Sequence, residues 1–179
     1  MSTQLDAYNY LCVPGFITPA QAAELALGFE AEAAALGFGG DSQIPQSQAS
    51  YNHLPFVRLL VEKIPQVSEL VGSPVLPTYT YARVHNDPGV ELRRHRDRPA
   101  CEISLTVNLA KTAAWPICFQ RPDGVEVCVD QNPGDAVLYL GCVADHWRPP
   151  YTGDHHIQVF LHYVRAYGEF SWAVFDRLQ

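Results

Sequence analysis

The sequence predicts a mainly β fold, a sandwich closed like a jelly roll, behind an N-terminal layer of helices. The hydrophobic period is about 3.6 residues before residue 74 and about two after it, which marks a change from helices to strands. Turn signals then recur at short intervals, as expected for many short strands. The chain is 47% hydrophobic and only 17% charged, which is typical of a packed globular protein.

Length and charge narrow the possible organisation and partners. The 179 residues predict a single domain, with residues 1–74 as the helical layer and residues 75–179 as the jelly-roll core. The net charge of −7 argues against nucleic acid and anionic membranes, because both are bound through clustered Lys and Arg. The first residues lack the basic and apolar regions of a secretory signal, and no apolar run reaches the ~18 residues of a membrane span. We therefore expect a cytoplasmic protein.

The first long helix has clear start and stop signals. A short strand is expected over Leu11–Val13. Thr18 then stands as an N-cap, Pro19 occupies the first helical position, and Gln21 completes a capping box. Gly37 is expected to end this helix.

A polar loop and two shorter helices are expected next. The Ser- and Gln-rich segment Asp41–Ser50 is predicted to be a loop, and it is a candidate lid. Pro65 disfavours helical geometry at the residue before it. The following apolar pattern is therefore expected to form two helices, at about 55–62 and 65–71.

From residue 75 the sequence reads as a series of strands. β-branched and aromatic residues alternate with others, and Pro-, Gly- and Asp-rich turns separate most of the segments. The expected strands cover residues 78–85, 101–109, 115–120, 125–130, 136–140 and 157–164, with one further short strand between the first two that carries His95 and Asp97. The chain has five widely spaced cysteines without a C-x-x-C pattern, and three of them lie in apolar, strand-like contexts where buried free thiols are common. The five cysteines are Cys12, Cys101, Cys118, Cys128 and Cys142.

The most informative stretch contains His95 and Asp97. One residue separates them, so on an extended strand their side chains point to the same side, about 6–7 Å apart at Cβ. An imidazole and a carboxylate so placed can hold one metal ion. We predict that His146 supplies the third ligand, because it follows a Pro-Gly-Asp turn and an apolar strand, which in a jelly roll returns the chain beside the first two. Two His and one carboxylate leave the opposite side of an ion open, as in non-haem Fe(II) oxygenases.

Several motifs together resemble a known family. They are Tyr-x-Arg, Pro-Gly-x-x-Leu-x-x-His95-x-Asp97-Arg, Cys-Glu-Ile-Ser, Pro-Gly-Asp-Ala-x-x-Tyr and His146-Trp-Arg. Over about residues 75–165 the chain resembles the Fe(II)/2-oxoglutarate-dependent dioxygenases, and among them the small bacterial prolyl-hydroxylase-like proteins. The resemblance implies a double-stranded β-helix core, with Fe(II) on His95, Asp97 and His146 and 2-oxoglutarate as a bidentate cosubstrate. It also implies that O₂ is consumed and that a peptidyl prolyl residue or a small amino-acid-like substrate is hydroxylated, with release of succinate and CO₂.

The far carboxylate of 2-oxoglutarate needs a cationic or hydrogen-bonding partner, and here the sequence departs from the family. Relatives carry Arg or Lys nine or ten residues after the distal His, where this chain has His155 and His156. If one of these is the anchor, cosubstrate affinity is expected to fall as the pH rises through ~6.5. The other candidates for cosubstrate contact are Tyr81, Arg83, His85, Lys111 and Gln158. Glu102, Asp145 and Ser104 are candidates for orienting the imidazoles.

Two other interpretations remain open. A metal-dependent cupin is suggested by the glycine six residues before His95 and the glutamate five after Asp97, although the first cupin motif has H-x-H. A non-catalytic jelly-roll binding module would use the same histidines as packed strand residues. Metal content separates this last interpretation from the two enzymes.

Overall fold

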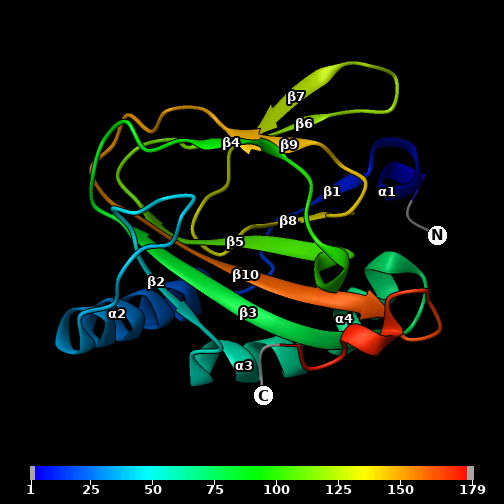
Figure 1. The fold of residues 1–179 in the computed structure, drawn as a ribbon, viewed down its shortest axis with the longest axis horizontal. Helices are drawn as coiled ribbons and strands as arrows, with labels where there is room; N and C mark the ends of the chain where they lie inside the picture. The colour runs from blue at the N-terminus through cyan, green and yellow to red at the C-terminus, as the bar shows by residue number, and fades with distance from the viewer. Residues whose placement is uncertain (1–2, 177–179) are drawn as a thin grey trace.

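The computed structural model describes residues 3–176 and consists of two antiparallel sheets with helices against one of them (Figure 1). The N-terminal elements are α1 (Thr3–Tyr8), β1 (Tyr10–Val13), α2 (Pro19–Leu36), β2 (Gln48–Tyr51), α3 (Leu54–Glu62) and α4 (Ile64–Val71). The remaining strands are β3 (Val75–His85), β4 (Leu92–His95), β5 (Ile103–Lys111), β6 (Ile117–Gln120), β7 (Glu126–Val129), β8 (Ala136–Tyr139), β9 (His146–Arg148) and β10 (His156–Arg165). Two short 3₁₀ turns cover Pro99–Cys101 and Ser171–Ala173.

The strand order is that of a jelly roll, as predicted. The larger sheet has the order β1-β8-β5-β10-β3-β2 and the smaller one β4-β9-β6-β7. From β3 onward the chain passes back and forth between the two sheets, so strands that are neighbours in space are far apart in sequence. Figure 1 shows the smaller sheet at the top, the larger sheet in the middle, and α2, α3 and α4 below it.

The helix signals in the sequence are confirmed. The Thr18 hydroxyl accepts a hydrogen bond from the Gln21 amide (3.1 Å), and the Gln21 side chain accepts one from the Thr18 amide (3.0 Å). Gly37 ends α2 with φ 65°, a left-handed conformation that favours glycine. Helices α3 and α4 match the two predicted helices, and the break between them falls at Lys63.

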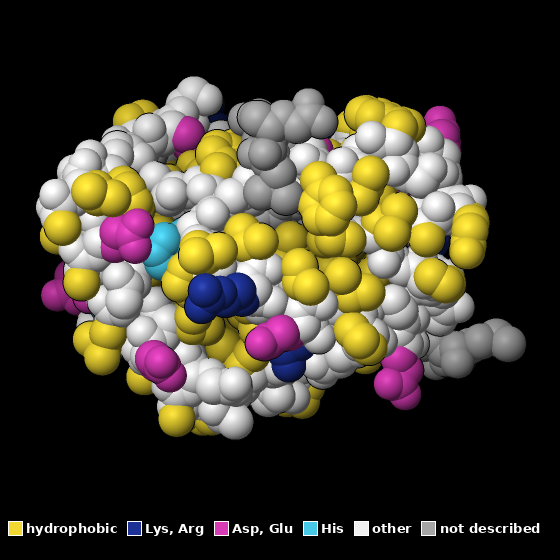
Figure 2. Space-filling view, turned by 90° about the horizontal axis from the view of Figure 1, so that it is seen from below, with side chains coloured by type: hydrophobic (Ala, Val, Ile, Leu, Met, Phe, Trp, Pro, Cys, Tyr) yellow, Lys and Arg dark blue, Asp and Glu magenta, His cyan; other side chains and the backbone are white. Residues whose placement is uncertain are grey.

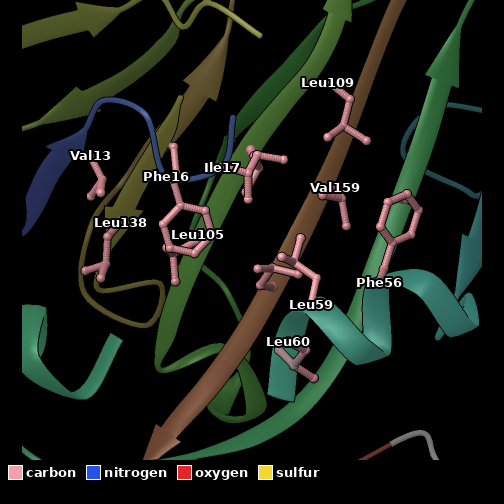
Figure 3. Packing of buried hydrophobic residues seen from close by; sticks show 14 of the residues in the cluster. Val13, Phe16, Ile17, Phe56, Leu59, Leu60, Leu105, Leu109, Leu138 and Val159 are labelled. Carbon is pink, nitrogen blue, oxygen red and sulfur yellow. The ribbon is translucent and has the colours of Figure 1, made fainter. Parts of the chain in front are cut away.

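Hydrophobic residues are concentrated between the larger sheet and the helices. Figure 3 shows Leu105, Leu109 and Val159 of the sheet packed near Phe56 and Leu59 of α3. Each such side chain stabilises the fold by roughly 1.5–3 kcal/mol when it is fully buried. Alternation along β10 turns its apolar residues (Ile157, Val159, Leu161) toward this layer and its other residues (His156, Gln158, Phe160, His162) toward the smaller sheet. The space between the sheets is therefore lined by polar and aromatic groups.

The structure also differs from the expectations. Helix α1 was not predicted. Strand β1, which matches the strand expected over Leu11–Val13, and the unexpected β2 both join the larger sheet, so the N-terminal third is not purely helical. Strand β2 overlaps the end of the expected 41–50 loop and pairs with β3. It was not predicted, because an edge strand needs only backbone hydrogen bonds and the Gln-Ala-Ser-Tyr sequence carries no strand signal. Cys118 and Cys128 stand directly opposite each other in the β6–β7 pair and form a disulfide, a pairing that the sequence did not predict.

The outer side of the helical layer has no single charged or apolar surface. Figure 2, seen from this side, shows hydrophobic side chains in several patches with few charged groups among them. None of the helices within residues 3–176 is long and apolar enough to cross a membrane.

Candidate metal centre

Two neighbouring strands of the smaller sheet bring the predicted metal ligands together. His95 on β4 is the register partner of His146 on β9, and their ring centroids are 4.3 Å apart. Strand β4 ends at His95, so Asp97 lies just beyond the strand, where its amide donates a hydrogen bond to the Gly141 carbonyl (2.9 Å). The Nε2 atoms of His95 and His146 each lie 3.6 Å from Oδ1 of Asp97.

Backbone carbonyls fix the orientation of both imidazoles. Nδ1 of His95 lies 2.8 Å from the Arg93 carbonyl oxygen, and Nδ1 of His146 lies 2.9 Å from that of Ala144. A carbonyl only accepts hydrogen bonds, so each Nδ1 carries the proton and each Nε2 presents a lone pair toward Asp97. The side chains that were expected to orient the imidazoles have other partners. Glu102 and Asp145 pair with arginines, and Ser104 contacts Asp97.

Asp97 sits in a site shaped for its carboxylate. The Ser104 hydroxyl donates to Oδ2 (3.2 Å), which leaves Oδ1 facing the two imidazoles. A Cβ atom on Gly141 would lie 2.6 Å from Oδ2, so only glycine allows this close approach. Burial alone would raise the pKa of Asp97, but the neighbouring imidazoles of His95, His146 and His162 hold it below its usual value. The carboxylate is therefore ionised at neutral pH.

These donors fit a divalent metal ion with open coordination positions. All three ligand atoms lie within 4.8 Å of one another. Two atoms bound at about 2.1 Å to one ion are at most about 4.2 Å apart, so the 3.6 Å separations need little movement. The three residues also line a cavity of about 360 Å³, whose wall includes Tyr79 and Phe160. The open side of the ion would face this cavity.

A second group of potential ligands lies beside the first but is less suited to a metal. Asp97, Cys101 and His162 are also close enough to share an ion. Burial, followed by the charge of Asp97, raises the pKa of the Cys101 thiol to about 12, and its sulfur lies 3.0 Å from the Tyr79 hydroxyl. Burial lowers the pKa of His162 to about 4, and Nδ1 of that ring lies 2.9 Å from the Ser104 hydroxyl. His162 therefore supports Asp97 through Ser104, and the protonated thiol of Cys101 is poorly suited to bind a metal ion.

Arg148 was not predicted as a site residue, yet it is a buried cation without an ion pair. Its side chain lies between the sheets, where it donates to the Thr106 hydroxyl (3.1 Å), to Oε1 of Gln131 (3.3 Å) and to the Trp115 carbonyl. Its Nε has no partner. Among residues 3–176 only two arginines are buried, and Arg83 has a carboxylate partner while Arg148 has none. Burial lowers the pKa of Arg148 to about 10, which still leaves it charged at neutral pH.

Two of the residues predicted to contact the cosubstrate, Tyr81 and Arg83, line the cavity of the metal ligands. Both donate to Oδ2 of Asp41, the tyrosine hydroxyl at 2.6 Å. The loop that carries Asp41 was singled out in the sequence only as a candidate lid.

The other residues predicted to contact the cosubstrate lie deeper between the sheets or outside the cavity of the metal ligands. His156 and His85 are buried, with ring nitrogens 2.9 Å from Nδ2 of Asn108 and 3.3 Å from Nε2 of Gln158, respectively. Burial lowers the pKa of His85 to about 3 and that of His156 well below its usual value, in both cases reinforced by the charge of Arg148. Both rings are therefore neutral at pH 6–8, so neither supplies an imidazolium to the cosubstrate.

Lys111 and His155 are paired with carboxylates and do not line the cavity of the metal ligands. The Lys111 ammonium donates to Asp130 (2.5 Å). His155 precedes β10 and faces opposite to His156, so its ring reaches Glu30 of α2 (3.0 Å) rather than the space between the sheets. We therefore leave both out of the proposed site, contrary to the prediction.

Comparisons with solved structures support the fold. No family model and no curated protein matches the chain. A Pseudomonas putida prolyl-4-hydroxylase is similar with a TM-score of 0.74 at 16% identity, over 90% of this chain and 95% of that one. The epimerase SnoN from nogalamycin biosynthesis, solved with Fe³⁺, alpha ketoglutarate and nogalamycin RO, has a TM-score of 0.74 at 16% identity (92% and 82% covered). HygX from Streptomyces hygroscopicus, solved with nickel and 2-oxoglutarate, has a TM-score of 0.68 at 14% identity (91% and 85% covered). The chain therefore shares the jelly-roll fold of these structures, two of which were solved with a metal ion and 2-oxoglutarate.

Proposed function

We propose that this protein is an Fe(II)- and 2-oxoglutarate-dependent oxygenase. The observation that carries the proposal is the convergence of two imidazole nitrogens and one carboxylate oxygen on one point at the edge of a cavity. Two neutral imidazoles and one carboxylate leave Fe(II) with net positive charge and with open positions for an anionic chelator and O₂. The neighbours solved with metal and 2-oxoglutarate support the same conclusion.

In this proposal His95, Asp97 and His146 hold the iron. The bound iron would supply the oxidising chemistry, in which 2-oxoglutarate and O₂ yield succinate, CO₂ and an oxidised substrate. Gly141 and Ser104 keep Oδ1 of Asp97 aimed at the ion, and the Arg93 and Ala144 carbonyls keep both Nε2 lone pairs toward it. These residues therefore prepare the metal site before any ligand arrives.

Arg148 is the residue that we assign to the far carboxylate of 2-oxoglutarate. It lies two residues after His146 on the same strand, so both side chains point between the sheets. Its contact Thr106 is likewise two residues from Ser104, the partner of Asp97, which places the guanidinium about one side-chain row from the metal site. A buried guanidinium surrounded by neutral oxygens favours an anion. Strand β9 would thus provide the cation that residues 155 and 156 lack.

The substrate class is inferred from the size of the cavity. A cavity of about 360 Å³ suits a small molecule or one side chain of a peptide better than a large ligand. We therefore infer hydroxylation of a prolyl residue in a peptide or of a small amino-acid-like molecule. The likeness in fold to a prolyl-4-hydroxylase is compatible with the first.

The test is an anaerobic titration with Fe(II) and then 2-oxoglutarate, followed by visible absorption. A chelating 2-oxo acid on Fe(II) is expected to give a charge-transfer band that requires both additions and that is lost in His95→Ala. Arg121→Met, a change in a surface ion pair with Asp123, is the matched control and should keep the band. Iron binding without a band would favour a cupin-type enzyme, and the absence of iron binding would favour a non-catalytic binding module.

A further inference from the structure

A loop of the protein places its own carboxylate inside the cavity that holds the metal ligands. We define the 41–47 loop as residues Asp41 to Ser47. Ser42 and Gln43 line both this cavity and a neighbouring one of about 410 Å³, and His95 lines both as well. The loop therefore forms the partition between two spaces that reach the metal site. In Figure 1 it belongs to the cyan segment that rises between the two sheets before β2.

The two oxygens of Asp41 have separate roles. Oδ1 accepts hydrogen bonds from the amides of Gln43 and Ile44, each at 2.9 Å, and so shapes the loop. Oδ2 accepts from the Tyr81 hydroxyl (2.6 Å) and from the Arg83 guanidinium. Burial would raise the pKa of Asp41, but these hydrogen bonds and the charge of Arg83 lower it to about 2.

Asp41 satisfies only part of the hydrogen-bonding capacity of Arg83. The Arg83 side chain is 3% exposed, so its charge depends on a partner within the protein or on a ligand. Asp41 offers it one oxygen only, because the other is held by the loop amides, and the second oxygen that the loop supplies is the neutral Oε1 of Gln43 (2.9 Å). The buried Nε of Arg83 has no partner. A free carboxylate can accept two hydrogen bonds from a guanidinium at once. The site thus fits a free carboxylate better than it fits the loop.

The surroundings indicate where the rest of such a ligand would lie. The same cavity is walled by Tyr51, Tyr79 and Phe160, and it extends to the metal ligands. Two other arginines of the cavity, Arg96 and Arg98, are 57% and 40% exposed and have aspartate partners. A carboxylate at Arg83 would therefore leave the body of the molecule against aromatic rings.

We propose that Tyr81 and Arg83 form a subsite for a carboxylate of the primary substrate, and that Asp41 fills this subsite as a latch until the substrate displaces it. This inference rests on the proposed oxygenase function, because the subsite belongs to the same cavity. The loop opens when the substrate carboxylate takes over Arg83, since opening without a replacement would leave a buried charge unpaired. The site thereby selects acids over their neutral analogues.

The experiment uses two probes, 3-phenylpropanoate and its neutral amide 3-phenylpropanamide, titrated calorimetrically into the metal-free chain. Asp41→Asn, which keeps an oxygen for the loop amides, and Asp41→Ala are both expected to bind the acid at least tenfold more tightly than the amide. The wild type should bind the acid more weakly than either variant. Asp41→Asn combined with Arg83→Met should lose the preference. Equal binding of both probes by the two Asp41 variants, or no binding of the acid, would overturn the subsite.

Hydrogen exchange tests the latch separately. The amides of Gln43 and Ile44 are expected to exchange several-fold faster in wild-type protein when the acid is added, and not when the amide is added. Acid binding without faster exchange would overturn the latch. Asp123→Asn, a change at a surface ion pair in the β6–β7 turn, is the matched control and should behave as the wild type. Because no iron or 2-oxoglutarate is present, failure here is distinct from failure of the charge-transfer test.

Discussion

Replacing Arg148 by Met should remove the affinity that comes from the far carboxylate of 2-oxoglutarate while chelation of the metal ion by the 2-oxo acid group is kept. The guanidinium has a free Nε and two nitrogens that now contact neutral oxygens, so it can offer two hydrogen bonds to a carboxylate. A hydrogen bond to a charged group contributes about 1.5–3 kcal/mol. Those bonds replace existing hydrogen bonds to neutral oxygens, so we expect Arg148→Met to lose about 3 kcal/mol of the binding free energy of 2-oxoglutarate. This loss corresponds to a roughly 100-fold larger dissociation constant.

The assay compares two 2-oxo acids on the Fe(II)-loaded protein under anaerobic conditions, with the charge-transfer band as the signal. Pyruvate can chelate iron like 2-oxoglutarate but has no far carboxylate. Arg148→Met should weaken 2-oxoglutarate about 100-fold and leave pyruvate within about twofold, and Arg148→Lys should recover part of the difference. An equal loss for both acids would mean that Arg148 only supports the fold of the metal site. A selective loss in Arg83→Met instead would move the anchor to the other buried arginine.

Three further predictions concern the supports of the site. Gly141→Ala should lower Fe(II) affinity at least tenfold in a chelator competition, because the new methyl group would displace Asp97, and an unchanged affinity would contradict the packing described at this position. Ser104→Ala should lower Fe(II) affinity about 10–100-fold in the same assay while circular dichroism stays unchanged, and intact affinity would show that this hydroxyl does not hold the carboxylate. The pKa of Asp41 is depressed to about 2 in the folded state, so its pairing with Arg83 stabilises the protein above the unfolded pKa of about 4 and is lost as the pH falls toward 2. The difference in unfolding free energy between wild type and Asp41→Asn should accordingly be constant from pH 5 to 7 and shrink below pH 4, and a constant difference down to pH 2 would refute the assignment.

The fold could be predicted largely because its signals are local. The cap at Thr18, the stop at Gly37 and the alternation along β10 are each specified by residues close in sequence. Strand β2 could not be predicted, because its pairing with β3 depends on a distant edge and not on its own residues. The disulfide was missed for the same reason, since only the β6–β7 register places Cys118 opposite Cys128.

The candidate site likewise combines features that the local sequence predicts with features that depend on distant parts of the chain. The prediction of three metal ligands came from spacing, and the structure brings these residues together. The residues that contact the cosubstrate were harder to predict. Residues 155 and 156 were chosen by their position along the chain, whereas the buried cation, Arg148, comes from β9 of the other sheet. A signal for Arg148 was present: it stands two residues after His146 and therefore shares its face. The role of Asp41 had no such signal, because it depends on a loop folding over β3.

The alternation of residues along β10 limits the sequence changes that this protein can accept during evolution. Its alternate residues serve two separate purposes, one set holding the helical layer and the other facing the pocket. Point replacements among the pocket-facing residues leave the packing against α3 intact, so the range of molecules accepted can diversify at little cost to folding. An insertion or deletion of one residue would exchange the two sets, placing histidines against Phe56 and isoleucine in the pocket. The length of β10 is therefore far more constrained than the identity of its inner residues.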